Sequence, residues 1–599
     1  MTRLKKTRTA VAGALMAALL AGCTAEAASI SADTASSGGA GSVSAEEVAA
    51  VTGVTVGDAL AANVTPEDVD VTYDEDDVVE VALSGDSATS DSDAVTAADG
   101  TVTITAAGTY RLSGTLAGQV VVDSPDDGVV RLVLDDAAIS SSTTAAIAFL
   151  DAGSAVVVLA DGSTNTLSDG ADPTADDAEP NGALYSTADL VVTGDGSLAV
   201  TGNANDGIAS KDGLVIAGGA ITVDAVDDGI RGKDYLVFSG GDVTVTAGGD
   251  GLKSDNAEDA AAGYVYVSGG TAEVTAGGDG VSAATDVVVG GGAVTVTSGG
   301  GAGQAVADDA SAKGLKGDVS VVVGGGTVEV DAADDAVHSD GAVSVTDGTL
   351  TLASGDDGVH AEADLTVAGG TLTVSESYEA LESAVVTISG GSLDVTASDD
   401  GVNLSGGSGA LTISGGTLVV DAEGDGLDSI GAGTMTGGTV VVSGTTAGGN
   451  GGLDLDGGLT VDGGVLLVTD SGSMSMSPSA DSAQGWVAAS LGSSLPAGTV
   501  VQVLDDAGEV VATYTAQKSM ATLVYSAGDV ASGATYSIVS GGTASGDDTG
   551  GLAPGGSAEG AAELTSVTAG AALAGGMGGG MGGAPGAGGG FDGGPRPGN

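Results

Sequence analysis

The chain is poor in cysteine, aromatic side chains and basic residues. Of its 599 residues, one is Cys, 2% are aromatic and 14 are Lys or Arg, against 82 Asp or Glu. A single thiol excludes a disulfide framework, so stability must come from packing, hydrogen bonds or bound metal. A net charge of −68 disfavours nucleic acid and anionic membranes as direct partners. The scarcity of aromatic rings argues against the stacking platform expected for neutral glucans.

The one cysteine follows an apolar run at the start of the chain. Four basic residues precede residues 11–21, a run too short to span a bilayer as a mature helix. The run ends in Leu20-Ala21-Gly22-Cys23, which resembles a bacterial lipobox. We therefore predict a lipoprotein signal peptide over 1–22, lipidation of Cys23, membrane anchoring at the cell surface, and a flexible tether over 23–55. The alternative is an ordinary secretory signal with a chance Cys.

What the chain has in abundance is glycine and small apolar residues. Glycine accounts for 108 residues, and hydrophobic residues make up 42% of the chain. This composition excludes a disordered acidic protein. Many Val and Thr residues with Gly throughout indicate β-structure with tight turns.

A short motif, mostly Asp-Gly followed by an aliphatic residue, recurs at a basic spacing of 22 residues. We call the first residue of each motif the anchor. An apolar residue such as Ile208 or Ile230 recurs two residues after each anchor. Each unit also holds a Gly pair such as Gly218-Gly219, followed by alternating apolar residues. This period predicts an all-β, right-handed, single-stranded parallel β-helix whose coils stack about 4.8 Å apart. The anchors are Asp206, Asp228, Asp250, Asp279, Lys313, Asp335, Asp357, Glu379, Asp400 and Asp425.

The repeat also predicts the domain boundaries. We expect the β-helix over 56–470. A β-rich stretch over 485–542 lies off the period and is predicted to cap the open edge of the solenoid. Residues 543–599 are rich in Gly, Ala and Pro, cannot bury a core, and are predicted to be disordered.

Stacked coils would bring the anchor carboxylates close together. Two carboxylates about 4.8 Å apart repel by roughly 3.5 kcal/mol at an effective dielectric constant of about 20. Bound Ca²⁺ would offset this repulsion, because calcium accepts carboxylate and carbonyl oxygens in a tolerant geometry. Solvent, protonation or basic neighbours are alternatives, and Asp before Gly is also common in turns for backbone reasons alone. Zinc is disfavoured, because no free Cys pair exists and the only histidines, His338 and His360, are interpreted as surface imidazoles.

The few basic residues are clustered. Lys211, Arg231, Lys233 and Lys253 lie within two coils of one another. They either neutralise the anchor row internally or, together with calcium, bind an acidic sugar polymer. We take them as the predicted carbohydrate-binding residues.

Several motifs resemble a known family. Asp206-Gly-Ile-Ala-Ser-Lys-Asp-Gly-Leu, Asp227-Asp-Gly-Ile-Arg-Gly-Lys-Asp-Tyr and Gly249-Asp-Gly-Leu-Lys-Ser-Asp-Asn are similar to bacterial exported carbohydrate-binding β-helix proteins. The resemblance implies a calcium-containing β-helix that binds cellulose and polygalacturonate-like sugars without cleaving them. The anchors Lys313 and Glu379 depart from the family's Asp. Carried over by motif, the implied metal ligands are Asp206, Asp212, Asp227, Asp228, Asp234, Asp250 and Asp255.

The sequence therefore predicts a non-catalytic, calcium-binding lipoprotein that binds acidic or cellulosic polysaccharide at the cell surface. Two alternatives remain. One is a β-helix polysaccharide lyase with Arg231 or Lys253 as the base. The other is an adhesive surface protein stiffened by calcium.

Overall fold

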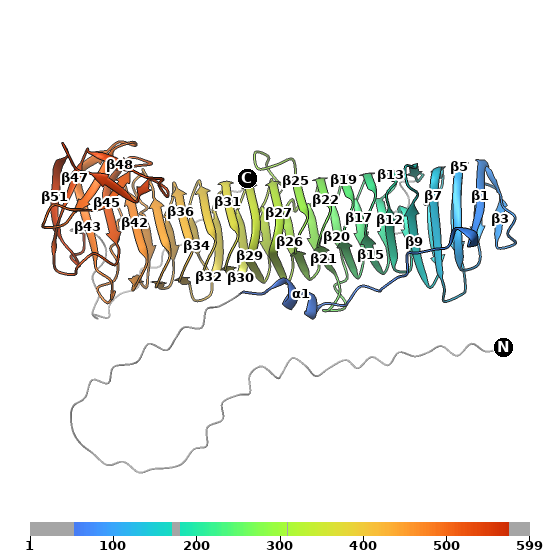
Figure 1. Cartoon of the computed structure of the whole chain (residues 1–599), viewed down its shortest axis with the longest axis horizontal. Helices are drawn as coiled ribbons and strands as arrows, with labels where there is room; N and C mark the ends of the chain where they lie inside the picture. The colour runs from blue at the N-terminus through green and yellow to red at the C-terminus, as the bar shows by residue number, and fades with distance from the viewer. Residues whose placement is uncertain (1–52, 171–179, 308–309, 574–599) are drawn as a thin grey trace, which may run out of the picture. The chain divides into compact units, whose positions relative to one another are not determined.

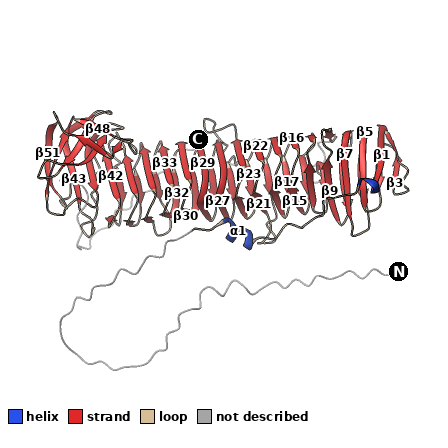
Figure 2. Ribbon diagram, in the orientation of Figure 1, coloured by secondary structure: helices blue, strands red, loops and turns tan. Residues whose placement is uncertain are grey.

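A parallel β-solenoid of about 15 turns dominates the structure, a computed structural model that describes residues 53–170, 180–307 and 310–573 (Figure 1). Figure 2 shows strands throughout and very little helix. The predicted all-β parallel β-helix is confirmed. Among the described residues no helix is long and apolar enough to cross a membrane.

A typical coil contains three strands separated by short corners, although two of them run together in coils such as that of β27 (Ser320–Ala332). In one coil these are β14 (Asp206–Ser210), β15 (Gly213–Ile216) and β16 (Ala220–Ala225). Strand β16 pairs in parallel with β19 (Asp242–Ala247) of the next coil, with Ile221 opposite Val243. Side chains of β16 alternate between exposed and buried, so the predicted period-2 pattern and the 22-residue register are both confirmed.

One column of strands follows the anchors, and it positions the anchors and the residues three positions after them. Its members are β14, β17 (Ile230–Gly232), β20 (Leu252–Ser254), β23 (Val281–Ala283), β26 (Leu315–Gly317), β28 (Val337–Ser339), β30 (Val359–Val367), β32 (Leu381–Ile388), β34 (Val402–Leu404), β37 (Leu427–Ser429) and β40 (Leu453–Leu455).

The interior of this column is the predicted stack of aliphatic side chains. Ile208, Ile230 and Leu252 are fully buried and lie opposite one another in register. The glycine after the anchor is required by close packing, because a Cβ on Gly229 would lie 2.3 Å from Cγ1 of Val245. The Gly pair serves the next corner, where Gly219 has a φ of +96° that disfavours other residues.

The β-helix begins later than predicted. Its first strand, β1, spans Val78–Gly85, and residues 53–77 form a strap on the outside of the coils. The strap holds α1 (Val56–Ala62), capped by Thr55, whose Ala59 packs on Val288 and Val322 (Figure 1). The predicted start at 56 was wrong because the strap's apolar residues pack against the outer surface of the coils instead of lining the interior.

The C-terminal cap is larger than predicted. Strand β46 (Met520–Ser526) pairs antiparallel with both β42 (Val465–Asp470) and β43 (Trp486–Leu495), which ends the parallel stacking. A five-stranded antiparallel sheet follows, in which β51 (Ala562–Thr568) pairs with β47 (Thr535–Ser540). Its other members are β44 (Val500–Leu504), β45 (Val510–Thr515) and β49 (Leu552–Ala553).

The prediction of disorder from residue 543 was therefore wrong for residues 543–573. These residues gain backbone hydrogen bonds at sheet edges, which composition alone does not reveal. The predicted signal peptide, Cys23, the tether up to residue 52 and the Gly-rich segment 574–599 lie outside the described residues.

Candidate functional site

The anchors stack directly above one another, as the 22-residue spacing predicts. The amide of Gly207 donates to the carbonyl of Asp228 at 3.0 Å, and the amide of Gly229 donates to the carbonyl of Asp250 at 2.8 Å. The carboxylates join this ladder, because Oδ1 of Asp228 accepts from the amide of Asp250 at 3.0 Å and Oδ1 of Asp250 from that of Asp279 at 2.8 Å. The anchor aspartates thus have a structural role that requires no ligand.

From Asp206 to Asp335 every anchor carboxylate lies near a basic side chain. Arg231 bridges Asp206 at 2.7 Å and Asp255 at 3.2 Å. Lys253 bridges Asp228 at 3.1 Å and Asp250 at 2.8 Å. We call the anchors from Asp206 to Asp335 the paired segment. Its remaining pairs are Lys316 with Asp279 at 3.9 Å and Lys313 with Asp335 at 2.7 Å.

Three of the seven predicted metal ligands come together. Carboxylate oxygens of Asp206, Asp227 and Asp228 lie within 4.8 Å of one another. Burial raises the pKa of Asp206 to about 7; Arg231 opposes this rise, and the charges of Asp228 and Asp227 add to it. Oδ1 of Asp206 is buried and has no hydrogen-bond partner. An oxygen-only set with surplus negative charge fits the requirements of Ca²⁺.

The other four predicted ligands are not members of this trio. Asp250 and Asp255 adjoin it through Lys253 and Arg231. Asp212 and Asp234 belong to a second acidic row at the next corner, where burial and then the charge of Asp189 raise the pKa of Asp212 to about 6. The set of metal ligands predicted from the motifs therefore combined residues of two separate acidic rows.

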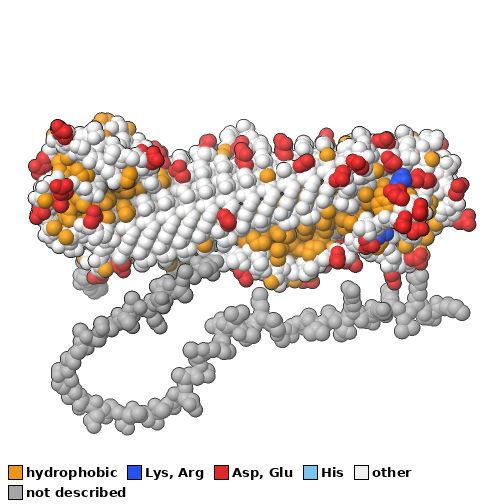
Figure 3. Space-filling model, viewed as in Figure 1, with side chains coloured by type: hydrophobic (Ala, Val, Ile, Leu, Met, Phe, Trp, Pro, Cys, Tyr) orange, Lys and Arg blue, Asp and Glu red, His pale blue; other side chains and the backbone are white. Residues whose placement is uncertain are grey.

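The four predicted carbohydrate-binding cations fall into two groups with different positions. Arg231 and Lys253 are each held between two carboxylates. Lys211 and Lys233 stand at equivalent positions of adjacent coils, directly after β14 and β17. Among the described residues Lys233 forms no ion pair with a carboxylate. Figure 3, which shows one face, has Lys and Arg visible only near the first coils, while Asp and Glu occur along its length.

The column three residues after the anchors changes sign along the solenoid. Arg231 lies opposite Lys253, Lys316 opposite His338, and His360 opposite Glu382. Farther on, Glu382 lies opposite Asn403 and Asn403 opposite Asp428. The two histidines thus mark the transition from a basic to an acidic surface.

A groove of about 760 Å³ opens where this transition occurs. Lys313, His338 and His360 line it together with Tyr378, Glu379 and Asn403. Both anchors that depart from Asp, Lys313 and Glu379, lie in this lining. The anchor position of the repeat therefore departs from Asp at two of the coils that line the groove.

Tyr378 is the functional candidate that sequence reasoning missed. The residue is 47% exposed, and every other described Tyr, Phe or Trp is at least partly buried. A hydrogen bond with Asp399 raises the pKa of Tyr378 to about 12. The available signal was a break in the repeat, since Asp227, Asp334, Asp356 and Asp399 occupy the same position in other coils.

Hydrogen-bonding groups surround this ring. Nδ2 of Asn403 donates to Oε2 of Glu379 at 2.7 Å, and the hydroxyl of Ser405 donates to Oε1 of Glu382 at 2.7 Å. Burial raises the pKa of Glu379 to about 7. One flat apolar surface beside amide, hydroxyl and carboxyl groups is a combination suited to a polar ring-shaped ligand.

A family model described as carbohydrate-binding domain-containing protein matches residues 98–358 and 359–537, more than half of the chain. A protein of the same description from Acetivibrio thermocellus is 37% identical over 139 residues, which are 22% of this chain and 48% of that protein. The match thus spans about half the length of that relative. The solved structure of a polysaccharide lyase-like protein from C. thermocellum, a gadolinium derivative, is 31% identical, with 42% of this chain and 94% of that chain covered and a TM-score of 0.36.

Proposed function

The chain belongs to the family of carbohydrate-binding domain-containing proteins, and from this premise we propose that it binds a polysaccharide without cleaving it, in the groove beside Tyr378. The observation that carries the location is the exposure of Tyr378, the one exposed aromatic ring among the described residues. An exposed aromatic ring at a groove offers a flat face on which a sugar ring can stack.

The groove has the groups that a sugar requires. The C–H face of a pyranose can stack on the phenol of Tyr378. Hydroxyls at the edge of the sugar can donate to Glu379 and Glu382 and can accept from Asn403. Each of these groups already forms a hydrogen bond within the protein, so the side chains are oriented before the sugar arrives.

The charge of the groove distinguishes acidic from neutral polymers. Asp356, Asp357, Glu379 and Glu382 face Lys313 and the two histidines. A bare uronate would be repelled by these carboxylates, so retention of polygalacturonate would need a bridging cation such as Ca²⁺. A neutral, cellulosic chain would need none. We propose both modes of binding, with Asp206, Asp227 and Asp228 as a separate calcium site that stabilises the coils.

The basic residues support binding over cleavage. A lyase base must be unprotonated near neutral pH. The pKa of Lys253 is raised, because the attraction of Asp228 and Asp250 outweighs the effect of burial, and the pKa of Arg231 is raised in the same way by Asp206 and Asp255. Neither side chain is suited to abstract a proton.

The location of the protein is a separate proposal. We propose that it is exported and held at the cell surface by lipid on Cys23. Radiolabelled fatty acid should be incorporated into the full chain and should be absent from Cys23→Ser. Labelling of Cys23→Ser equal to the parent would overturn this proposal.

The groove is tested by retention of the full chain on insoluble cellulose and on immobilised polygalacturonate, each with Ca²⁺ and with chelator. Tyr378→Ala should weaken retention about tenfold or more, the scale of an interface hot spot. The matched control is Ile430→Ala, which shortens another exposed apolar side chain and should retain the glycan normally. Unchanged retention by Tyr378→Ala would exclude the groove, and unsaturated sugar products would contradict a non-catalytic role.

A further inference from the structure

Both histidines of the chain lie in the groove, one coil apart. His338 in β28 is opposite His360 in β30, and their ring centroids are 5.0 Å apart. Neither ring is freely exposed, since their side chains are 12% and 21% accessible. We propose that His338 and His360, together with Asp335, bind one divalent transition-metal ion of the zinc type. This inference requires no sugar in the groove.

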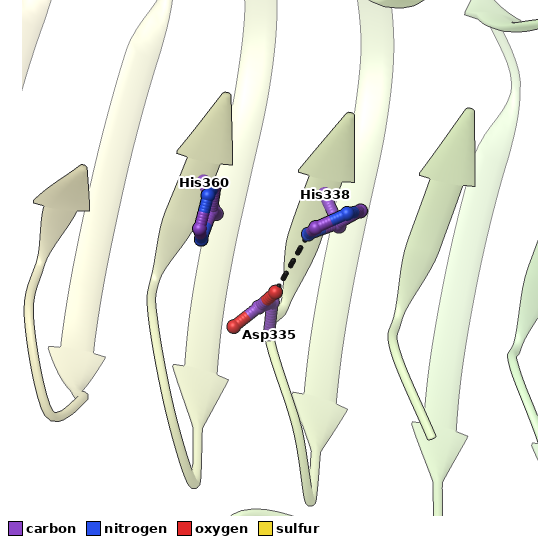
Figure 4. A group of neighbouring side chains, drawn as sticks. All are labelled: Asp335, His338 and His360. Atoms are coloured by element: carbon purple, nitrogen blue, oxygen red, sulfur yellow. Dashed lines mark hydrogen bonds and ion pairs between the residues drawn. The ribbon is translucent and has the colours of Figure 1, made fainter. Parts of the chain in front are cut away.

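The donor atoms already converge. Nδ1 of His338 lies 2.7 Å from Oδ2 of Asp335 (Figure 4), and one donor atom each from Asp335, His338 and His360 lie within 4.8 Å of one another. Nδ1 of His360 lies 3.0 Å from Oδ2 of Asp357, which offers a fourth donor. In a tetrahedral zinc site with metal–nitrogen bonds of about 2.0–2.1 Å, two nitrogens are about 3.4 Å apart. Closing the site therefore requires small side-chain rotations and the withdrawal of Lys313, whose Nζ lies 2.7 Å from Oδ2 of Asp335.

The outer nitrogen of His338 has the hydrogen-bond partner that metal-binding histidines require, and the outer nitrogen of His360 faces a carboxylate at longer range. Nε2 of His338 lies 3.1 Å from Oδ1 of Asp340, and Nε2 of His360 lies 3.8 Å from Oε1 of Glu362. Each carboxylate stands two residues after its histidine. When a ring donates its Nε2–H to such a carboxylate, its Nδ1 lone pair is free to coordinate a metal.

The donor set selects the class of metal. Calcium prefers oxygen ligands only, whereas paired imidazoles with carboxylates suit Zn²⁺, Cu²⁺ or Ni²⁺. Lys313 is the one lysine in the lining of the groove, against five carboxylates including Asp335 and Asp357. A dication would therefore be attracted electrostatically. Zinc was disfavoured from the sequence because the chain has only one Cys and two His. In the structure, stacking of the coils brings both histidines and a buried aspartate together.

The test uses the untagged full chain, because a histidine tag would add competing ligands. Zn²⁺ binding is measured by calorimetry in a large excess of Ca²⁺, which occupies carboxylate-only sites. We expect one zinc ion per chain to remain bound. His338→Asn and His360→Asn should each weaken zinc binding more than about 100-fold, and Asp340→Asn about 10–100-fold, the range for an orienting partner. Asn403 occupies the same column naturally, so the coil tolerates Asn there.

The matched control is Asp227→Asn, which removes a carboxylate from the other acidic cluster and should leave zinc binding unchanged. Co²⁺ bound to the parent should give ligand-field absorption bands that both histidine variants lose, provided their far-ultraviolet circular dichroism matches the parent. Complete displacement of zinc by Ca²⁺, or unchanged affinity in both histidine variants, would overturn the proposal.

Discussion

The anchor column contains two segments with the same backbone and different charge balance. In the paired segment, Arg231, Lys253, Lys313 and Lys316 lie beside the anchor carboxylates. In the unpaired segment, from Asp357 to Asp425, the anchors have His360, Asn403 or backbone amides as neighbours. Both segments keep the same ladder, since Oδ1 of Asp400 accepts from the amide of Asp425 at 2.6 Å.

The difference in charge balance distinguishes anchors with a structural role from anchors that are available to bind a ligand. A carboxylate that accepts a backbone hydrogen bond and contacts a cation is satisfied by the protein itself. Burial raises the pKa of Asp400 to about 7, and the neighbouring charges of Asp399 and Asp425 add to the rise. The unpaired segment therefore remains electrostatically unfavourable until protons, cations or ligand hydroxyls arrive, and the groove lies at its beginning.

The largest expected effect is the loss of a cation from the paired segment. Arg231→Ala leaves Asp206, which is 1% exposed, without its cationic partner, so the folded protein must bury an unpaired charge or take up a proton there. We expect a loss of about 3–5 kcal/mol in the free energy of unfolding, measured with chemical denaturant. Asn403→Ala in the same column of the unpaired segment should cost about 1 kcal/mol, the value of one hydrogen bond. Equal losses would remove the distinction between the segments.

Calcium should have the next largest effect. At 100 times its dissociation constant, Ca²⁺ should raise the free energy of unfolding by about 2.7 kcal/mol. Asp227→Asn should reduce this gain, because it removes a carboxylate from the trio in the paired segment. Asp234→Asn, in the second acidic row, should not. A thermal melt of each variant with Ca²⁺ and with chelator gives the measurement.

Acidification should stabilise the unpaired segment. The pKa values of Glu379 and Asp400 are about 7, and that of Asp425 is about 6, raised in each case mainly by burial. A raised pKa means that the folded protein holds the proton more tightly. The resulting stability is complete below about pH 4 and is lost as the pH rises through about 6–7.

The free energy of unfolding should consequently increase from pH 8 to pH 5, by about 1 kcal/mol for each such carboxyl. Asp335 does not oppose this trend. Burial alone would raise its pKa, but the hydrogen bond from His338 and the charge of Lys313 outweigh burial and lower the pKa to about 2. A stability maximum at pH 8 in the absence of metal would contradict this account.

The smallest effect separates the two roles of an anchor carboxylate. Asp400→Asn keeps the acceptor for the amide of Asp425 and removes a repelled charge, so stability should rise by up to about 1 kcal/mol. Asp228→Asn also keeps the acceptor but removes a partner of Lys253, so stability should fall by about 1 kcal/mol. The same sign in both variants would show that the charge balance does not differ.

The spacing of 22 residues was enough to predict the coil, its interior and the vertical order of the anchors. A shift of one residue would move Ile208 and Ile230 from the core to solvent, so one register is strongly favoured. The pairing of Arg231 with Asp206 was not predictable in this way. It runs diagonally from one coil to the previous one and depends on which rotamer of the long side chain is packed.

Other features depended on information that the repeat does not contain. Tyr378 became a candidate only when every other described ring was seen to be at least partly buried. The second acidic row could not be told apart from the anchor row by motif order. Residues 543–573 looked unstructured because Gly and Ala dominate them, yet their backbone completes the cap sheet.

The strap has a consequence for folding kinetics. Neighbouring coils contact each other at short separations along the chain, so the solenoid can propagate coil by coil once nucleated. The strap contacts are far more distant: Asn63 donates to Asp286 across 223 positions, and the hydroxyl of Tyr264 donates to the carbonyl of Val64 across 200. Such contacts have a high loop-closure entropy and need a finished surface. We therefore expect the strap, although it is synthesised before the first coil, to dock only after the coils that it contacts have formed.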